Sequence, residues 1–255
     1  MTFVARIIDG GRQASRDLVD ALLPPSCLCC EARVDRPGTA CTACWTELSF
    51  IERPYCEVLG LPFTYDLGPG ALSAEVIAAP PPFQRARAAV AYDGAAERLV
   101  TALKFGDRTD LAPWMARWMW RAALDYRAHD GETPPVLIPV PLHRARMVKR
   151  STNQAGELTR ALAALSSYEH RPLWLERPRH TRSQVGLGRK ARVRNVAGAF
   201  NVPDAARGDL HGRRVILVDD VFTTGETLAA CARALKRGGA AHVDCLTFAR
   251  VTREL

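Results

Sequence analysis

Apolar residues recur along the chain in two patterns, one typical of β-strands and the other typical of helices. Short apolar runs predict strands over residues 87–92, 136–140, 173–175, 215–218 and 242–249. Helical spacing predicts helices over residues 95–105, 111–124, 151–165 and 227–237. Ser151 is a suitable N-cap for the third of these helices. Because strands alternate with helices, the pattern indicates an α/β domain with a mostly parallel sheet.

Five of the eight cysteines lie within one stretch of eighteen residues. Cys27 and Cys30 form one Cys-x2-Cys pair, and Cys41 and Cys44 form a second pair, with ten residues between the two pairs. Zinc is commonly bound by four thiolates in a tetrahedron, and two such pairs are typical of a zinc ribbon. The spacing therefore predicts one structural zinc site at these four cysteines. Cys29 is a spare thiol that could replace Cys30, and a set of buried free cysteines is the alternative.

The distribution of glycine and proline suggests how the chain is divided. Both residue types are frequent over residues 60–83, which is typical of a linker. We expect an N-terminal helix and zinc-ribbon region over residues 1–60, a linker over residues 61–83, and the α/β domain over residues 84–255. No internal repeat is visible in the sequence.

Composition excludes several classes of protein. Of the 255 residues, 47% are hydrophobic and 24% are charged, which is ordinary for a globular protein and excludes disorder as the main state. No stretch approaches the roughly 20 apolar residues of a membrane span. Charged residues interrupt the apolar N-terminus where a signal peptide would have its core. We therefore expect a cytoplasmic protein without a membrane span, whose thiols stay reduced.

The net charge of +8 is unevenly distributed. Residues 143–194 hold thirteen basic and three acidic residues, a local charge of +10, so the remainder carries −2. Such a concentration indicates an anionic partner such as a phosphate, a pyrophosphate, a nucleotide or a nucleic acid. A solvated arginine-rich face is the alternative.

Residues 215–228, which read VILVDDVFTTGETL, hold the main candidate for chemistry. A buried strand ends at Asp219 and Asp220, and a threonine-rich turn with one glycine leads into a helix. Ligands of open α/β sheets bind beyond the carboxyl ends of the strands, and a helix N-terminus favours phosphate. Carboxylates suit sugar hydroxyls, so the segment predicts a site for a ribose 5-phosphate. A turn with capping threonines and surface aspartates is the alternative.

This segment resembles the phosphoribosyl pyrophosphate (PRPP) motif of type I phosphoribosyltransferases. The chain as a whole resembles the ComF family, in which a zinc ribbon precedes a phosphoribosyltransferase domain. Further matching positions include Leu103-Lys104-Phe105, Pro139-Val140-Pro141-Leu142, Asn153-Gln154-Ala155, Arg179, Thr181, Gln184, Arg192, Asn195 and Phe200. Two departures stand out. The family's Arg-Gly-Phe-Asn-Gln becomes Arg-Ser-Thr-Asn-Gln from Arg150, and Leu59 replaces the partner of Cys56 in a second cysteine pair.

The resemblance implies a type I phosphoribosyltransferase fold, a mostly parallel sheet flanked by helices, with a small N-terminal zinc-ribbon domain. It implies PRPP with Mg²⁺ as ligand and transfer of the ribose 5-phosphate group to an acceptor that the sequence does not identify. Asp219 and Asp220 would be the catalytic pair, holding the ribose hydroxyls and stabilising an oxocarbenium-like transition state. The 5-phosphate would be bound by Thr223, Thr224, Gly225, Glu226 and Thr227.

The pyrophosphate group is expected to face the loop after the strand at 136–140 and a basic flap over residues 179–194. The candidate residues are Pro141, Leu142, His143, Arg144, Arg150, Arg182, Arg189 and Arg192. Lys104, at a predicted helix end, is a further candidate. For each arginine taken singly, a contribution to solubility is the alternative.

A second hypothesis comes from the same resemblance. ComF-type proteins are associated with competence, the uptake of single-stranded DNA, so the protein could bind a single strand through its basic segment. The PRPP site would then be regulatory or vestigial. Homodimers are common among relatives, and Trp120, which lies off the apolar face of its helix, is a candidate contact.

Overall fold

The computed structural model describes residues 24–129, 131–142, 152–178 and 198–252. The chain forms two compact units that divide between Glu47 and Leu48. The predicted regions 1–60, 61–83 and 84–255 stay predictions. None of the helices in the described ranges has the length and apolar character that crossing a membrane requires.

Over its described residues, 24–47, the first unit has one short helix, α2 (Thr42–Thr46), with Cys41 at its N-cap. An antiparallel bridge between Ser26 and Arg33 closes the turn that precedes it. Helix and turn are too small to bury a hydrophobic core of their own. This unit therefore needs another source of stability.

The second unit alternates strands with helices. Its strands are β1 (Ala86–Ala91), β2 (Val136–Pro139), β3 (Arg214–Phe222) and β4 (His242–Arg250). The α-helices among its described residues are α3 (Ala74–Ala78), α4 (Gly94–Phe105), α5 (Ala112–Ala122), α7 (Gln154–Ser166), α9 (Asp204–Leu210) and α10 (Glu226–Arg237). Two 3₁₀ turns, η1 (Thr109–Leu111) and η2 (Leu124–Tyr126), flank α5.

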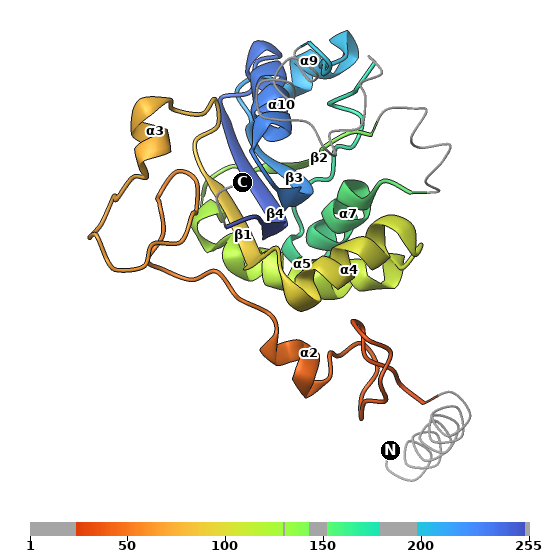
Figure 1. The fold of residues 1–255 in the computed structure, drawn as a ribbon. Coiled ribbons are helices and arrows are strands. Elements are labelled where there is room, and N and C mark those ends of the chain that lie inside the picture. Colours follow the sequence, from red (N-terminus) through yellow and green to blue (C-terminus); the bar gives the residue numbers. More distant parts are fainter. Residues whose placement is uncertain (1–23, 130, 143–151, 179–197, 253–255) are drawn as a thin grey trace, which may run out of the picture. The chain divides into compact units, whose positions relative to one another are not determined.

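The four strands form one parallel sheet in the order β1-β4-β3-β2. Figure 1 shows α4, α5 and α7 on one face of the sheet and α9 and α10 on the other. The central strand β3 is thus covered on both faces and paired on both sides, which explains the unbroken apolar run from Val215 to Val218. The α/β architecture predicted from the alternation of elements is confirmed.

Two predicted details are wrong. Helix α7 begins at Gln154 with Asn153 at the N-cap, not Ser151. The Asn153 side-chain amide donates a hydrogen bond of 3.2 Å to the Val140 carbonyl, which fixes the helix start at the end of β2. The strand predicted over residues 173–175 is a turn, because Pro172 lacks the N–H group that strand pairing requires.

Strand β3 is longer than its apolar run. It continues four residues beyond Val218 because Asp219 to Phe222 run alongside the end of β4. The two aspartates therefore lie within the last part of a strand, where neighbouring backbones hold them in place. This extension sets the geometry of the candidate site.

Candidate functional site

Asp219 and Asp220 lie near the carboxyl end of β3, and alternation along a strand directs their side chains to opposite faces of the sheet. Lys104, in the last turn of α4, places its Nζ atom 3.0 Å from Asp220 Oδ1. On the other face lies the buried thiol of Cys231, on α10. Burial is the main cause that raises the pKa of this thiol, and the negative charge of Asp219 raises it further. The two carboxylates thus interact with residues of different helices, Asp220 with α4 and Asp219 with α10.

The carboxyl group of Asp219 is poorly stabilised as an anion. Burial raises its pKa, and the charge of Asp220 raises it further, whereas Lys104, the Asp220 backbone N–H and Arg177 act in the opposite direction. The resulting pKa is about 7. A carboxyl with such a pKa would be stabilised in its ionised form by any additional cation brought to the pair.

The turn after β3 leads directly into α10. Gly225 is the N-cap and has φ of 74°, in the left-handed region. A Cβ atom at this position would lie 2.7 Å from the Phe222 ring, so both the backbone angle and the space require glycine. A helix N-terminus presents backbone N–H groups and partial positive charge, two features that favour phosphate.

The hydroxyl residues of the turn are accessible. Thr223 is exposed, and Thr224 and Thr227 are half-buried, as is Glu226 in the first turn of the helix. The predicted 5-phosphate residues are therefore gathered around one helix N-terminus. The arrangement can offer backbone and hydroxyl donors together to one phosphate group.

The loop after β2 lies at the same edge of the sheet. Pro139 pairs with Val218, so Pro141 and Leu142 follow β2 where the aspartates follow the apolar part of β3. Both residues are half-buried. The other predicted pyrophosphate residues lie outside the described residues: His143, Arg144, Arg150, Arg182, Arg189 and Arg192.

One basic residue beside the pair was not singled out from the sequence. The side chain of Arg177 is buried, its Cζ atom lies 5.2 Å from the centroid of the Phe200 ring, and its charge lowers the pKa of Asp219. The adjacent Glu176 and Asn201 bridge to each other through backbone hydrogen bonds of 2.9 and 3.0 Å. The sequence signal was weak, since Arg177 is one arginine among many in a basic segment.

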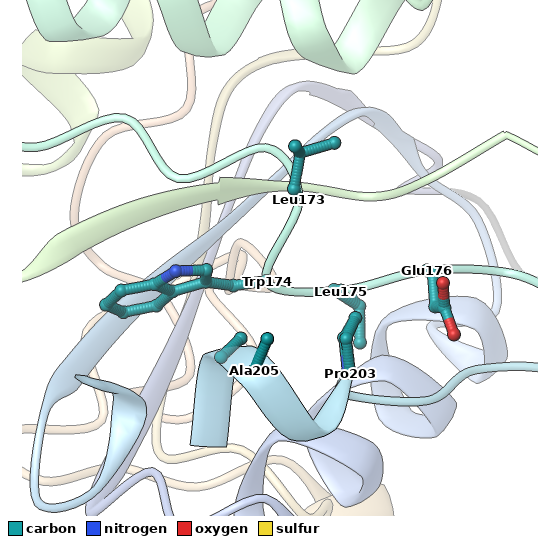
Figure 2. A pocket seen from close by; sticks show the side chains of 7 residues that line it. Leu173, Trp174, Leu175, Glu176, Pro203 and Ala205 are labelled. Carbon is teal, nitrogen blue, oxygen red and sulfur yellow. The ribbon is translucent and has the colours of Figure 1, made fainter. Parts of the chain in front are cut away.

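A cavity of about 400 Å³ lies elsewhere in the second unit. Figure 2 shows its lining, which comes from the turn after His170 and from the start of α9: Leu173, Trp174, Leu175, Glu176, Pro203, Ala205 and Ala206. The lining is mainly apolar and contains none of the predicted site residues. This lining lacks the donors that a sugar phosphate needs. The carboxyl end of β3 is therefore the better candidate for a phosphate site.

The first unit contains a four-cysteine cluster of the predicted composition. The Sγ atoms of Cys27, Cys30, Cys41 and Cys44 all lie within 4.8 Å of one another. Cys30 Sγ and Cys41 Sγ are 3.7 Å apart, and sulfurs bound to one tetrahedral zinc at about 2.3 Å would be about 3.8 Å apart. The four thiols therefore fit a structural zinc ion.

Backbone N–H groups favour the thiolate form of Cys27. Cys27 Sγ accepts hydrogen bonds from the N–H groups of Cys29 and Cys41, at 3.4 and 3.2 Å. Burial raises the pKa of the Cys27 thiol, but these hydrogen bonds and those from Cys30 outweigh burial and bring the pKa to about 6. Deprotonation, which zinc binding requires, is thus favoured before metal arrives.

Comparison with known proteins covers both units. Residues 117–254 match the family described as Phosphoribosyl transferase domain, and residues 18–75 match the family described as Double zinc ribbon domain. The DNA utilization protein YhgH of Escherichia coli K12 is 30% identical over 211 residues, covering 82% of this chain and 89% of that protein. Competence protein F of Haemophilus influenzae is 33% identical over 153 residues, covering 60% of this chain and 66% of that protein.

A solved structure adds only a weak likeness. The glutamine PRPP amidotransferase of B. subtilis aligns with 60% of this chain and 27% of its own at 14% identity, with a TM-score of 0.33. The assignment of the chain therefore rests on the family matches and on the sequence relatives.

Proposed function

This chain belongs to the ComF family, with a zinc ribbon and a domain of the type I phosphoribosyltransferase fold, and we propose that it binds PRPP with Mg²⁺ and transfers the ribose 5-phosphate group to an acceptor. The observation that carries this proposal lies at the carboxyl end of β3, where Asp219, Asp220 and the N-terminus of α10 occupy one short segment. No feature of the described residues identifies the acceptor.

Each part of this segment suits one part of PRPP. The N–H groups at the start of α10, with the hydroxyls of Thr223, Thr224 and Thr227, bind the 5-phosphate. Asp219 and Asp220 accept hydrogen bonds from the ribose hydroxyls. As the bond from C1 to pyrophosphate breaks, positive charge grows on the sugar ring, and the carboxylates stabilise it electrostatically.

The leaving pyrophosphate requires positive charge on the opposite side of the ribose. We assign this role to Lys104, because its ammonium group already contacts Asp220 in the candidate site. The loop at Pro141 and Leu142 follows the neighbouring strand and would bring further donors. His143, Arg144, Arg150, Arg182, Arg189 and Arg192 are proposed to complete this side as a basic flap that excludes water.

The carboxylate pair also fits magnesium. Mg²⁺ prefers oxygen ligands and usually keeps several waters while one or two carboxylates and substrate phosphates hold it. Asp219 and Asp220 supply such oxygens, and a cation beside them would oppose the burial and the Asp220 charge that raise the pKa of Asp219. Bound there with PRPP, the ion would neutralise the pyrophosphate.

The test is calorimetric titration of the full chain with PRPP and Mg²⁺. The wild type is expected to bind, and the double variant Asp219→Asn, Asp220→Asn is expected to lose binding while keeping its circular dichroism spectrum. Asp209→Asn, an exposed aspartate on α9, is the matched control and should bind as the wild type does. Binding that survives in the double variant would exclude the proposed site.

Transfer is tested separately from binding. A screen of nucleobases and other nucleophiles with pyrophosphate release as readout should show turnover that requires Mg²⁺ and both aspartates. Tight PRPP binding without turnover toward any acceptor would support a regulatory role for the site.

The names of the relatives favour a second candidate, a role in DNA utilisation and competence. We propose that single-stranded DNA is a partner, bound through phosphate contacts of the basic segment. Affinity measured by fluorescence anisotropy should then fall steeply with added salt, with a slope set by the number of phosphates neutralised. A homodimer with Trp120 as a contact stays a prediction.

A further inference from the structure

Residues 54–63 repeat the backbone hydrogen bonding of residues 25–34 with an offset of 29. The bridge between Ser26 and Arg33 recurs between Tyr55 and Pro62. Three further backbone bonds of the first segment have a counterpart in the second. Cys27 N donates to Ala32 O (2.7 Å) as Cys56 N donates to Leu61 O (2.8 Å), and Glu31 N donates to Cys27 O (3.1 Å) as Gly60 N donates to Cys56 O (2.7 Å). Val34 N donates to Pro25 O as Phe63 N donates to Pro54 O, both at 2.9 Å.

The backbone angles follow the same repeat. Glu31 has φ of 63°, and Gly60, at the equivalent position, has φ of 62°. At Gly60 the conformation also needs glycine for space, because an added Cβ would lie 2.5 Å from the Ala86 carbonyl oxygen. The turn at residues 56–61 is therefore a zinc-knuckle turn in its backbone.

The second half of the ribbon repeats as well, with an offset of 32. Leu28 N donates to Thr39 O at 3.1 Å, and Glu57 N donates to Ala71 O at 2.9 Å. Helix α2 starts after Cys41, and helix α3, of the same length, starts after Ser73.

The sulfur of Cys56, like that of Cys27, accepts one N–H from its own turn and one from the residue that precedes the following helix. Cys56 Sγ accepts the N–H groups of Leu59 and Ser73 at 3.4 and 3.3 Å. Cys27 Sγ accepts the N–H of Cys41, the counterpart of Ser73, at 3.2 Å. The geometry that prepares a thiolate for zinc is thus retained around Cys56.

The ligands themselves are not retained. The positions of Cys27, Cys30, Cys41 and Cys44 correspond to Cys56, Leu59, Ser73 and Val76. Leucine and valine offer no ligand atom, and a single thiolate cannot hold a tetrahedral zinc ion. Leu59 and Val76 are buried and belong to the hydrophobic core of the second unit.

A buried cation joins this segment to the sheet. Arg250, on β4, is 4% exposed, donates from Nη1 to the Leu59 carbonyl, and has its Cζ atom 4.6 Å from the centroid of the Phe222 ring. Burial lowers its pKa to about 10, and the Cys56 thiol and the Glu75 carboxyl partly oppose that shift. The guanidinium therefore brings positive charge and hydrogen bonding next to the vacated ligand set.

We infer that residues 54–78 are a second zinc ribbon that folds without metal. Core packing of Leu59 and Val76 and the guanidinium of Arg250 stabilise it in place of zinc. This explains why the chain matches a double ribbon while only one four-cysteine cluster occurs among the described residues. It also explains why the boundary between the two compact units falls between the ribbons, at Glu47.

This inference is tested by measuring the zinc content of the purified full chain with elemental mass spectrometry. The expected value is one zinc per chain. Cys44→Ser should lower it at least twofold, while Cys56→Ser, the same substitution at an equally buried cysteine, should leave it unchanged. Two zinc ions per wild-type chain, or a loss of zinc in Cys56→Ser, would overturn the inference.

Restoring the ligands provides a test in the opposite direction. The triple variant Leu59→Cys, Ser73→Cys, Val76→Cys should bind a second zinc, because the backbone already has the required geometry. A folded triple variant that holds one zinc would contradict the assignment of these positions. If the triple variant does not fold, the comparison of Cys44→Ser with Cys56→Ser still decides the metal content.

Discussion

Lys104 Nζ lies 3.0 Å from Asp220 Oδ1, and this ion pair joins the end of α4 to the end of β3. The side chains are 23% and 12% exposed, so the pair is largely shielded from water. The charge of the lysine also lowers the pKa of Asp219, in opposition to burial and to the charge of Asp220, which raise it. In the proposed function, the same ammonium group would also meet the pyrophosphate of PRPP.

Replacing Lys104 with methionine should destabilise the protein by about 1–2 kcal/mol, because it leaves a partly buried carboxylate without its partner. Urea denaturation measures the change. Lys236→Met is the matched control, since this lysine occupies the last turn of α10 but is exposed, and it should shift stability by less than about 0.5 kcal/mol. Equal effects of the two substitutions would show that the ion pair contributes nothing specific.

Gly225→Ala should destabilise the turn by about 1–3 kcal/mol and weaken PRPP binding, because a left-handed φ and the Phe222 ring both oppose a Cβ atom. Gly212→Ala separates the two causes. Gly212 has φ of 71° but no atom within 4 Å of an added Cβ, so it retains only the backbone cost. Thermal unfolding of both variants is the measurement, and an equal loss would exclude crowding at Phe222.

Binding of PRPP with Mg²⁺ should strengthen about tenfold between pH 6 and pH 8 and then level off, because Asp219, with a pKa of about 7, must lose its proton to accept the cation. Calorimetry in buffers of different ionisation enthalpy should show proton release near pH 7. For stability the sign is reversed: the raised pKa makes the folded state bind more protons, so stability falls as pH rises from about 4 to about 7. Asp219→Asn should remove that decline.

Arg177→Met should raise the pKa of Asp219 above about 7 and move the midpoint of the pH dependence of PRPP binding upward, because it removes a charge that favours the carboxylate. Arg171→Met is matched, since its Cζ atom also lies 5.2 Å from an aromatic centroid, that of Trp174, but its side chain is 45% exposed. A merely structural role of Arg177 would lower stability without moving the pH midpoint.

The sequence predicted those parts of the site that lie on one continuous segment. Asp219, Gly225 and the cysteine pairs follow from local spacing, because strand ends, helix starts and zinc knuckles are short-range features. The contact of Lys104 with Asp220 joins residues more than a hundred positions apart, so only the packing of α4 against the sheet reveals it. The family resemblance drew attention to Lys104 without indicating its partner.

For the inferred second ribbon, the sequence retains only the remnant of one cysteine pair, Cys56 with Leu59 in place of its partner. A zinc ribbon is recognised by its cysteines, and three of the four ligand positions at residues 54–78 no longer hold one. Its backbone hydrogen bonds persist because Gly60 and the core packing of Leu59 maintain the turn. Backbone geometry can thus outlast the ligands by which the sequence identifies it.

Removal of zinc should act on one ribbon and spare the other. In the first unit, cysteine ligands take the place of a hydrophobic core, so a chelator should abolish its structure and increase proteolysis within residues 24–47. The second ribbon belongs to the core of the second unit, so residues 54–78 should stay protected and PRPP binding should be retained within about twofold. Limited proteolysis with mass spectrometry, followed by calorimetry on the chelated protein, measures both effects.

The matched control is Cys44→Ser, which should reproduce the cleavage pattern without chelator. Cleavage at residues 54–78 on chelation would show that the second ribbon depends on metal after all.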